Sequence, residues 1–124
     1  MKIEYTIFKE RELILSTFPS YVDEKIVINF WEVLKQDPGF EPDYNHLVIL
    51  TRVSQFNLLR DEMKNLALAH PFSMISRRAV VTSSEYIYRM HKIYEIYQEY
   101  HGLNFSVFNS CKEAYFWIKK WKIK

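Results

Sequence analysis

The chain has 124 residues, 48% of them hydrophobic and 26% charged, with a formal net charge of +2. This length suits one domain, and we expect a single domain over residues 1–124. Positive and negative side chains are interleaved, so no strong field attracts a phosphate backbone, and we expect no nucleic-acid partner. Gly39 and Gly102 are the two glycines, too few for the glycine-rich loops that bind nucleotides, and we expect no cofactor.

The cysteine content and the apolar runs bear on the compartment. Cys111 is alone, which excludes an intrachain disulfide and a cysteine-based zinc site and fits a reducing compartment. The N-terminus alternates polar and apolar residues and lacks the apolar core of a signal peptide. The apolar runs at residues 47–50 and 114–118 are far shorter than the ~20 residues that span a bilayer. We therefore expect a cytoplasmic protein with no membrane span.

The first half of the chain predicts a hairpin, a helix, a buried strand and a second helix. Residues 2–8 and 13–18 form the two hairpin strands. The spacing of Ser20 and Asp23 marks the start of a helix that runs to about residue 36. Its expected inner face is Val22, Ile26, Phe30, Val33 and Leu34. The run at residues 46–51 is typical of a central strand, and residues 58–70 form a helix. Its expected inner face is Leu59, Met63, Leu66 and Ala67.

The second half predicts two more strands, at residues 78–81 and 104–108, each followed by a helix. The helix over residues 84–101 is expected to bury Tyr86, Met90, Ile93, Tyr97 and Tyr100. His91 would then point to solvent. Ser110 and Glu113 open the last helix, and its expected inner face is Ala114, Trp117, Ile118 and Trp121. The order β-β-α-β-α-β-α-β-α predicts an α/β fold with one five-stranded mixed sheet and right-handed crossovers.

Four stretches carry a resemblance to a known group of proteins. They are Leu47-Val48-x-Leu50 with Val53-Ser54-x-Phe56, Arg77-Arg78-Ala79-Val80-Val81, residues 84–94 with Met90 and Tyr94, and Phe108 with Glu113-Ala114-x-x-Trp117-Ile118. The chain resembles small, mostly uncharacterised bacterial proteins with a SpoIIAA-like fold. That fold is shared by STAS domains and, more distantly, by CRAL-TRIO lipid-transfer domains.

The resemblance breaks at one functional position. STAS anti-sigma antagonists carry a phosphorylatable hydroxyl at the start of the helix that follows the third strand, where Phe56-Asn57-Leu58-Leu59 stands here. A phosphate-controlled contact is therefore not expected. We expect any association through this edge to be constitutive, with Phe56, Leu58 and Leu59 as candidate contacts. The alternative is that both leucines pack beneath the preceding loop.

No set of residues predicts catalysis or metal binding. The four histidines, at positions 46, 70, 91 and 101, lack the i, i+4 spacing of a helical zinc pair. No Gly-x-Ser-x-Gly occurs, and Cys111 is expected on the inner face of the last helix. We expect no catalytic residue and no metal, and an enzyme is the minority interpretation.

Aromatic residues make up 17% of the chain, and they motivate the functional hypotheses. Trp31, Tyr88 and Phe116 fall off the predicted inner stripes, which makes them candidates for isolated surface positions, a pocket lining or an interface. The lysine-rich end from residue 117 either complements the helix dipole or rests on an anionic membrane. The leading hypothesis is a non-enzymatic STAS-like module that binds a protein partner or a second copy of itself. The alternative is binding of a small apolar or lipid-like ligand.

Overall fold

The computed structural model describes residues 2–100 and 104–120. A five-stranded sheet is its centre, with the strand order β1-β2-β4-β6-β7. The five strands are β1 (Glu4–Phe8), β2 (Leu13–Thr17), β4 (Asn45–Ile49), β6 (Arg77–Val81) and β7 (Asn104–Phe108). The first two strands are antiparallel and the later pairs are parallel. The predicted α/β fold with one five-stranded mixed sheet is confirmed.

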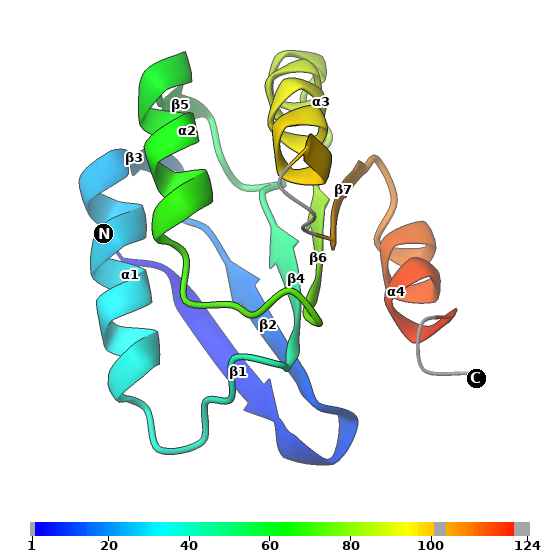
Figure 1. Cartoon of the computed structure of the whole chain (residues 1–124). Helices are drawn as coiled ribbons and strands as arrows, with labels where there is room; N and C mark the ends of the chain where they lie inside the picture. The colour runs from blue at the N-terminus through cyan, green and yellow to red at the C-terminus, as the bar shows by residue number, and fades with distance from the viewer. Residues whose placement is uncertain (1, 101–103, 121–124) are drawn as a thin grey trace.

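Four helices cover the sheet. They are α1 (Glu24–Gln36), α2 (Arg60–Ala69), α3 (Glu85–Tyr100) and α4 (Cys111–Lys120). The first three lie on one face, with α2 between α1 and α3, and α4 lies on the other face (Figure 1). Successive parallel strands therefore step in one direction along the sheet while their connecting helices stay on one side, as right-handed crossovers require.

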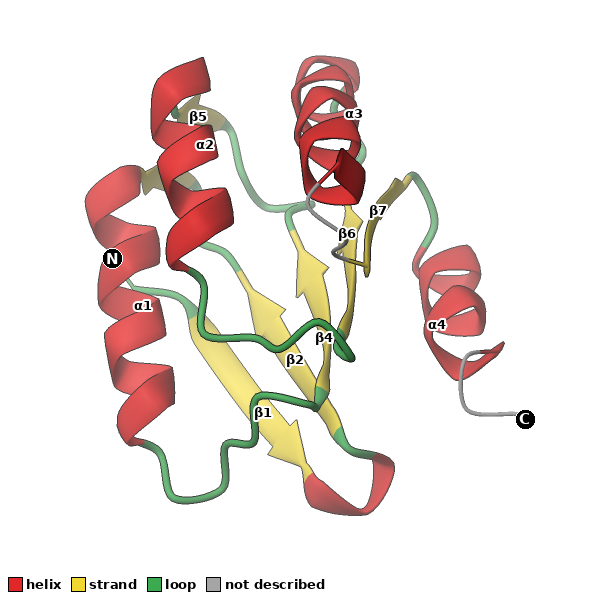
Figure 2. Cartoon of the chain, viewed as in Figure 1, coloured by secondary structure: helices red, strands yellow, loops and turns green. Residues whose placement is uncertain are grey.

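A second, two-stranded sheet was not predicted. It pairs β3 (Tyr21–Asp23) with β5 (Gln55–Asn57) in parallel, near the upper ends of α1 and α2 (Figure 2). Because Ser20 leads into β3, α1 begins later than the sequence predicts. Its N-cap is Asp23, whose side chain accepts a hydrogen bond from the Ile26 backbone at 2.9 Å.

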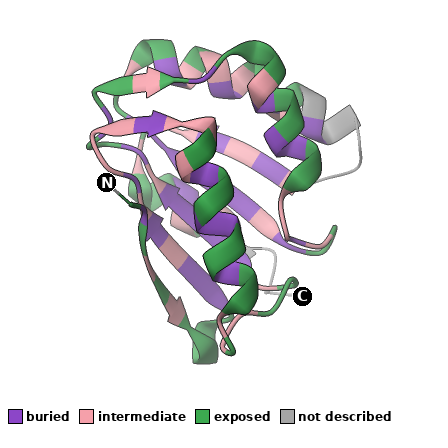
Figure 3. Cartoon of the chain, turned by 90° about the vertical axis from the view of Figure 1, so that its left-hand side faces the viewer, coloured by how far each residue is buried: buried purple, intermediate pink, exposed green. Residues whose placement is uncertain are grey.

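Alternation along the strands divides the core into two clusters; Figure 3 shows where buried residues lie along the chain. The larger lies between the sheet and α1, α2 and α3 and includes Ile14, Val48, Val80 and Val107 from the strands. The smaller lies under α4, where Ala114 and Ile118 pack against Leu47 and Ala79. Strands β4 and β6 are therefore covered on both faces, which explains the apolar runs that they contain.

The predicted inner face of α3 is wrong. Tyr86 is 61% exposed and Ile93 is 44% exposed, and the side chains of Tyr97 and Tyr100 lie outside the described residues. The helix instead buries Ile87, His91, Tyr94 and Gln98. This neighbouring stripe is more polar, and it faces inward because the sheet beneath it carries an arginine that contacts Gln98.

The predicted inner face of α1 holds in part: Phe30 and Leu34 are buried, Val22 is buried in β3, and Ile26 packs half-buried against the core. Val33 is 47% exposed, whereas Trp31 is 8% exposed and lies in the larger cluster. Val27, Phe30 and Leu34 complete the buried side of the helix. The indole of Trp31 contacts the ring of His70 edge-on at a centroid distance of 6.3 Å. Trp31 is thus a core residue and not an isolated surface aromatic.

Two further predicted faces hold in part. In α2, Met63, Leu66 and Ala67 are buried, but Leu59 is 69% exposed because it precedes the helix as its N-cap. In α4, Ala114 and Ile118 are buried, Trp117 is half-buried, and Trp121 lies outside the described residues. Cys111 is exposed, contrary to expectation, because the first residue of α4 precedes the turn that reaches the sheet.

The packing of α4 can be tested with two substitutions on the same helix. Ile118 is 3% exposed, so Ile118→Ala leaves a cavity and should lower the free energy of unfolding by about 2–4 kcal/mol. Phe116 is 68% exposed, and Phe116→Ala should change it by less than about 0.5 kcal/mol. Urea denaturation measures both values, and equal losses would contradict this orientation of α4.

Candidate functional site

One row of residues across the sheet carries the polar groups of the larger core. Strand register places Ile14, His46, Arg78 and Phe105 side by side. All four face α1, α2 and α3. The preceding residue, Arg77, points to the opposite face, where its Nη1 donates to the Trp117 backbone oxygen at 2.8 Å. Alternation in β6 thus places one arginine on each side of the sheet.

Arg78 is a buried cation with neutral partners. It is 6% exposed, and its Nη2 donates to Gln98 Oε1 at 2.8 Å. Its guanidinium carbon lies 5.4 Å from the centroid of Phe105 and 5.8 Å from that of Phe72. Within the described ranges, no carboxylate forms an ion pair with it. Burial lowers the pKa of Arg78, but arginine keeps its charge in proteins.

Gln98 is the matching buried amide from α3. It is fully buried, and its Nε2 is a donor without a hydrogen-bond partner. Its oxygen is committed to Arg78. Leaving a buried donor unpaired costs about 1–3 kcal/mol. Arg78 and Gln98 therefore combine a positive charge that no carboxylate pairs, among the described residues, with an amide N–H donor that has no acceptor.

Three histidines surround this pair in neutral form. Burial is the main cause that lowers the pKa of His46 to about 3, of His70 to about 3 and of His91 to about 4. The charge of Arg78 lowers the pKa of His46 and His70 further. His91 is 7% exposed, so the expectation that it points to solvent is wrong.

Hydrogen bonds and ring contacts fix the buried imidazoles. His46 Nε2 lies 2.8 Å from Ser16 Oγ, and its ring stacks on Phe72 at 4.8 Å. His91 Nδ1 lies 2.9 Å from the Ile87 carbonyl oxygen and donates to it. Both rings are thus held in place without a charged neighbour other than Arg78.

Several of these side chains line a small cavity of about 70 Å³. On the scale of about 10–15 Å³ for one water, it has room for several water molecules or a small polar group. His46, Arg78, His91 and Tyr94 supply its polar wall. The apolar wall is Phe18, Val27, Trp31, Val48, Leu50, Phe56, Leu58, Met63, Leu66, Val80 and Phe105.

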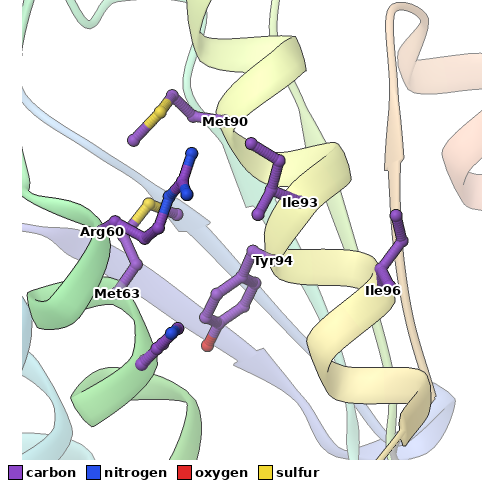
Figure 4. Close-up of a pocket in the computed structure, with 7 residues that line it drawn as sticks. Arg60, Met63, Met90, Ile93, Tyr94 and Ile96 are labelled. Atoms are coloured by element: carbon purple, nitrogen blue, oxygen red, sulfur yellow. The ribbon is translucent and has the colours of Figure 1, made fainter.

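An apolar groove of about 310 Å³ lies outside the cavity, between α2 and α3 (Figure 4). Met90, Ile93 and Ile96 come from α3, while Arg60 and Lys64 bring two cations from α2. Met63 and Tyr94 line both the groove and the inner cavity. The two spaces are therefore neighbours that share these two side chains.

The comparisons with known proteins address the fold. No family model and no curated protein matches the sequence. Among solved structures, the chain is similar to an uncharacterized protein of the DUF3478 family from Shewanella loihica PV-4, which has a SpoIIAA-like fold. The match has a TM-score of 0.62 and covers 94% of each chain at 13% identity. The fold is SpoIIAA-like. This likeness confirms the fold that the sequence resemblance implied.

Within the SpoIIAA-like fold, three of the six candidate interaction residues meet at the cavity. Trp31, Phe56 and Leu58 all line it. Leu58 is 6% exposed and belongs to the core, whereas Leu59 is 69% exposed, so burial of both leucines, the alternative that the sequence left open, holds for Leu58 alone.

The other three candidates are not brought together. Leu59 is 69% exposed and Phe116 is 68% exposed, but they belong to segments on opposite faces of the sheet. Tyr88 is half-buried against the larger cluster and carries Lys92 over its ring at 5.5 Å. These positions do not form one surface.

The described part of the chain shows neither a cluster of metal ligands nor a membrane-spanning helix. No group of three or more histidine, cysteine, aspartate or glutamate side chains within residues 2–100 and 104–120 is placed to hold a metal ion. Over the described helices, none is long and apolar enough to cross a membrane.

Sequence reasoning missed Arg78, Gln98 and the buried histidines. A signal for Arg78 does exist, because β6 begins with two successive arginines and is otherwise apolar. Successive side chains of a strand point to opposite faces of the sheet, and in a central strand both faces are covered. At least one of the two arginines is therefore expected to be buried. His91 and Gln98 carry no comparable signal.

The buried histidines predict a stability that falls in mild acid. Unfolded histidines bind protons near pH 6.5, whereas His46 and His91 in the fold resist protonation until about pH 3 and 4. Between these values the unfolded state holds more protons, so the free energy of unfolding should fall as pH is lowered. Each of the two histidines contributes about 1.4 kcal/mol per pH unit.

Urea denaturation at about pH 7 and about pH 5 measures this slope. The His91→Gln variant is the control, because it should lose one histidine's share of the dependence. A free energy of unfolding that does not change over this interval, or the same slope in both proteins, would contradict burial of neutral histidines.

Proposed function

We propose that the chain is a non-enzymatic binding module for a small amphipathic molecule, whose apolar body lies in the groove between α2 and α3. The observation that carries the proposal is the shared wall: Met63 and Tyr94 line both the groove and an inner cavity whose wall includes Arg78. A groove that borders an inner cavity in this way suits a small molecule, which could occupy both spaces. A folded protein partner would cover the groove and leave the cavity behind it unused.

The size and lining of the groove support a small ligand. Its volume of about 310 Å³ is at the lower end of the range of about 300–1,000 Å³ that ligand sites occupy. Met63, Met90 and Ile93 provide apolar contact, and methionine side chains adapt to irregular shapes. The site would accept an alkyl chain or a small ring.

The exposed stripe of α3 supplies the driving force. Ile93 is 44% exposed and Ile96 is 68% exposed, although both are large and apolar. Removing apolar surface from water is favourable by about 25 cal/mol per Å². A ligand lying along α3 would cover this stripe, which the sheet leaves uncovered because α3 turns its more polar side inward.

Association through the edge that contains Phe56, Leu58 and Leu59 has less support. Leu58 is buried and Phe56 is half-buried. Leu59 is then the single large apolar side chain of the three that is exposed, and a stable interface needs about 800 Å² from each partner. We therefore rank ligand binding above protein association for this STAS-like module.

The groove can be tested with the neutral probe 1-decanol. The Ile93→Glu variant places a charge against the ligand body and should weaken binding by about tenfold or more. Tyr86→Glu is the matched control, because Tyr86 is 61% exposed on the same helix and does not line the groove. It should bind 1-decanol as the unmodified chain does.

Isothermal titration calorimetry gives the affinities, and sedimentation gives the mass of the complex. The proposal is contradicted if neither 1-decanol nor a charged analogue binds. It is also contradicted if Ile93→Glu leaves binding unchanged, or if its effect is to dissociate a dimer that binds no probe.

A further inference from the structure

We propose that Arg78 is an anion site and that the ligand is a monocarboxylate with an apolar body, whose carboxylate pairs with this guanidinium inside the cavity. The inference rests on the proposed function and names the chemical class of its ligand. It adds a charged anchor inside the cavity, separate from the two cations, Arg60 and Lys64, that line the groove.

The first argument is the cost of the buried charge. A buried cation is normally paired, because transfer of an isolated charge from water is strongly unfavourable. Arg78 has an amide oxygen, the nearby hydroxyl of Tyr94 and two aromatic faces instead. Aromatic faces give partial compensation. A carboxylate would complete it, since the planar guanidinium matches a carboxylate with two parallel hydrogen bonds.

The second argument is the charge count of the cavity wall. Among the described residues that line the cavity, Arg78 is the one charged side chain. The imidazoles of His46 and His91, also in the wall, are neutral at physiological pH, since burial holds their pKa values at about 3 and about 4. One positive charge matches a single negative charge. A phosphate ester with two charges would leave one of them uncompensated in a buried site.

The third argument is access from the groove. Met63 and Tyr94 stand between the groove and the cavity. The Met63 side chain is flexible at three bonds and can shift to admit a head group. Burial raises the pKa of Tyr94 and the charge of Arg78 lowers it, so the Tyr94 hydroxyl lies close to the guanidinium, where a carboxylate would arrive. The ligand would therefore insert its head group first and keep its apolar body along α3.

The test compares decanoate with 1-decanol, which share the same chain and differ in charge. In the unmodified protein decanoate should bind about ten- to hundredfold more tightly. Arg78→Met keeps the length and apolar stem of the side chain and removes its charge. It should abolish the preference for decanoate and leave the affinity for 1-decanol the same or tighter.

A second variant keeps the inference testable if Arg78→Met does not fold. Gln98→Glu has nearly the same shape and places a carboxylate on Arg78 from within the chain, where the Gln98 oxygen already lies at 2.8 Å. This variant should remain folded by thermal denaturation and lose the preference for decanoate, because the internal carboxylate occupies the site.

The outcomes separate this inference from the proposed function. If neither probe binds the unmodified chain, the proposed function is wrong. If both bind equally well, or if Gln98→Glu still prefers decanoate, the groove binds ligands but Arg78 is not the anchor. If decanoate is preferred and both variants lose that preference, the anion site is established.

Discussion

The burial of one guanidinium organises the side of the sheet on which the candidate site lies. Strand β6 begins with two arginines, and alternation must send them to opposite faces. Arg77 reaches a carbonyl beneath α4, whereas Arg78 enters the core under α3. A buried cation needs acceptors and aromatic faces around it. The stripe of α3 that can supply them, with Tyr94 and Gln98, is the one that turns inward.

That orientation of α3 has a consequence on the outer surface. When Gln98 faces Arg78, Met90 and Ile93 turn toward α2 and toward solvent. The apolar groove between α2 and α3 therefore forms because the polar side of α3 faces the interior. The inner cavity and the outer groove arise from the same rotation of one helix, which explains why Met63 and Tyr94 belong to both.

Strand order and helix order could be predicted from the sequence, but the helix faces could not. The apolar run at residues 46–51 and the capping residue Ser110 are local signals. For α3, two adjacent stripes both contain large apolar residues, so periodicity alone cannot choose between them. The choice depends on Arg78, a residue on another element. The three-residue strands β3 and β5 are too short to carry any pattern of their own.

The residues at the start of α2 belong both to the wall of the cavity and to the stretch at which a phosphate-controlled contact was considered. The sequence predicts no phosphate-controlled contact over the stretch Phe56-Asn57-Leu58-Leu59. Within this stretch, Leu58 forms part of the cavity wall. The next residue, Leu59, is the N-cap of α2, and its backbone N–H donates to Glu62 Oε1 at 2.8 Å. A molecule bound inside the cavity would contact Leu58 and Met63, one before and one within α2. Under the proposed function, occupancy of the cavity would therefore act directly on the start of α2.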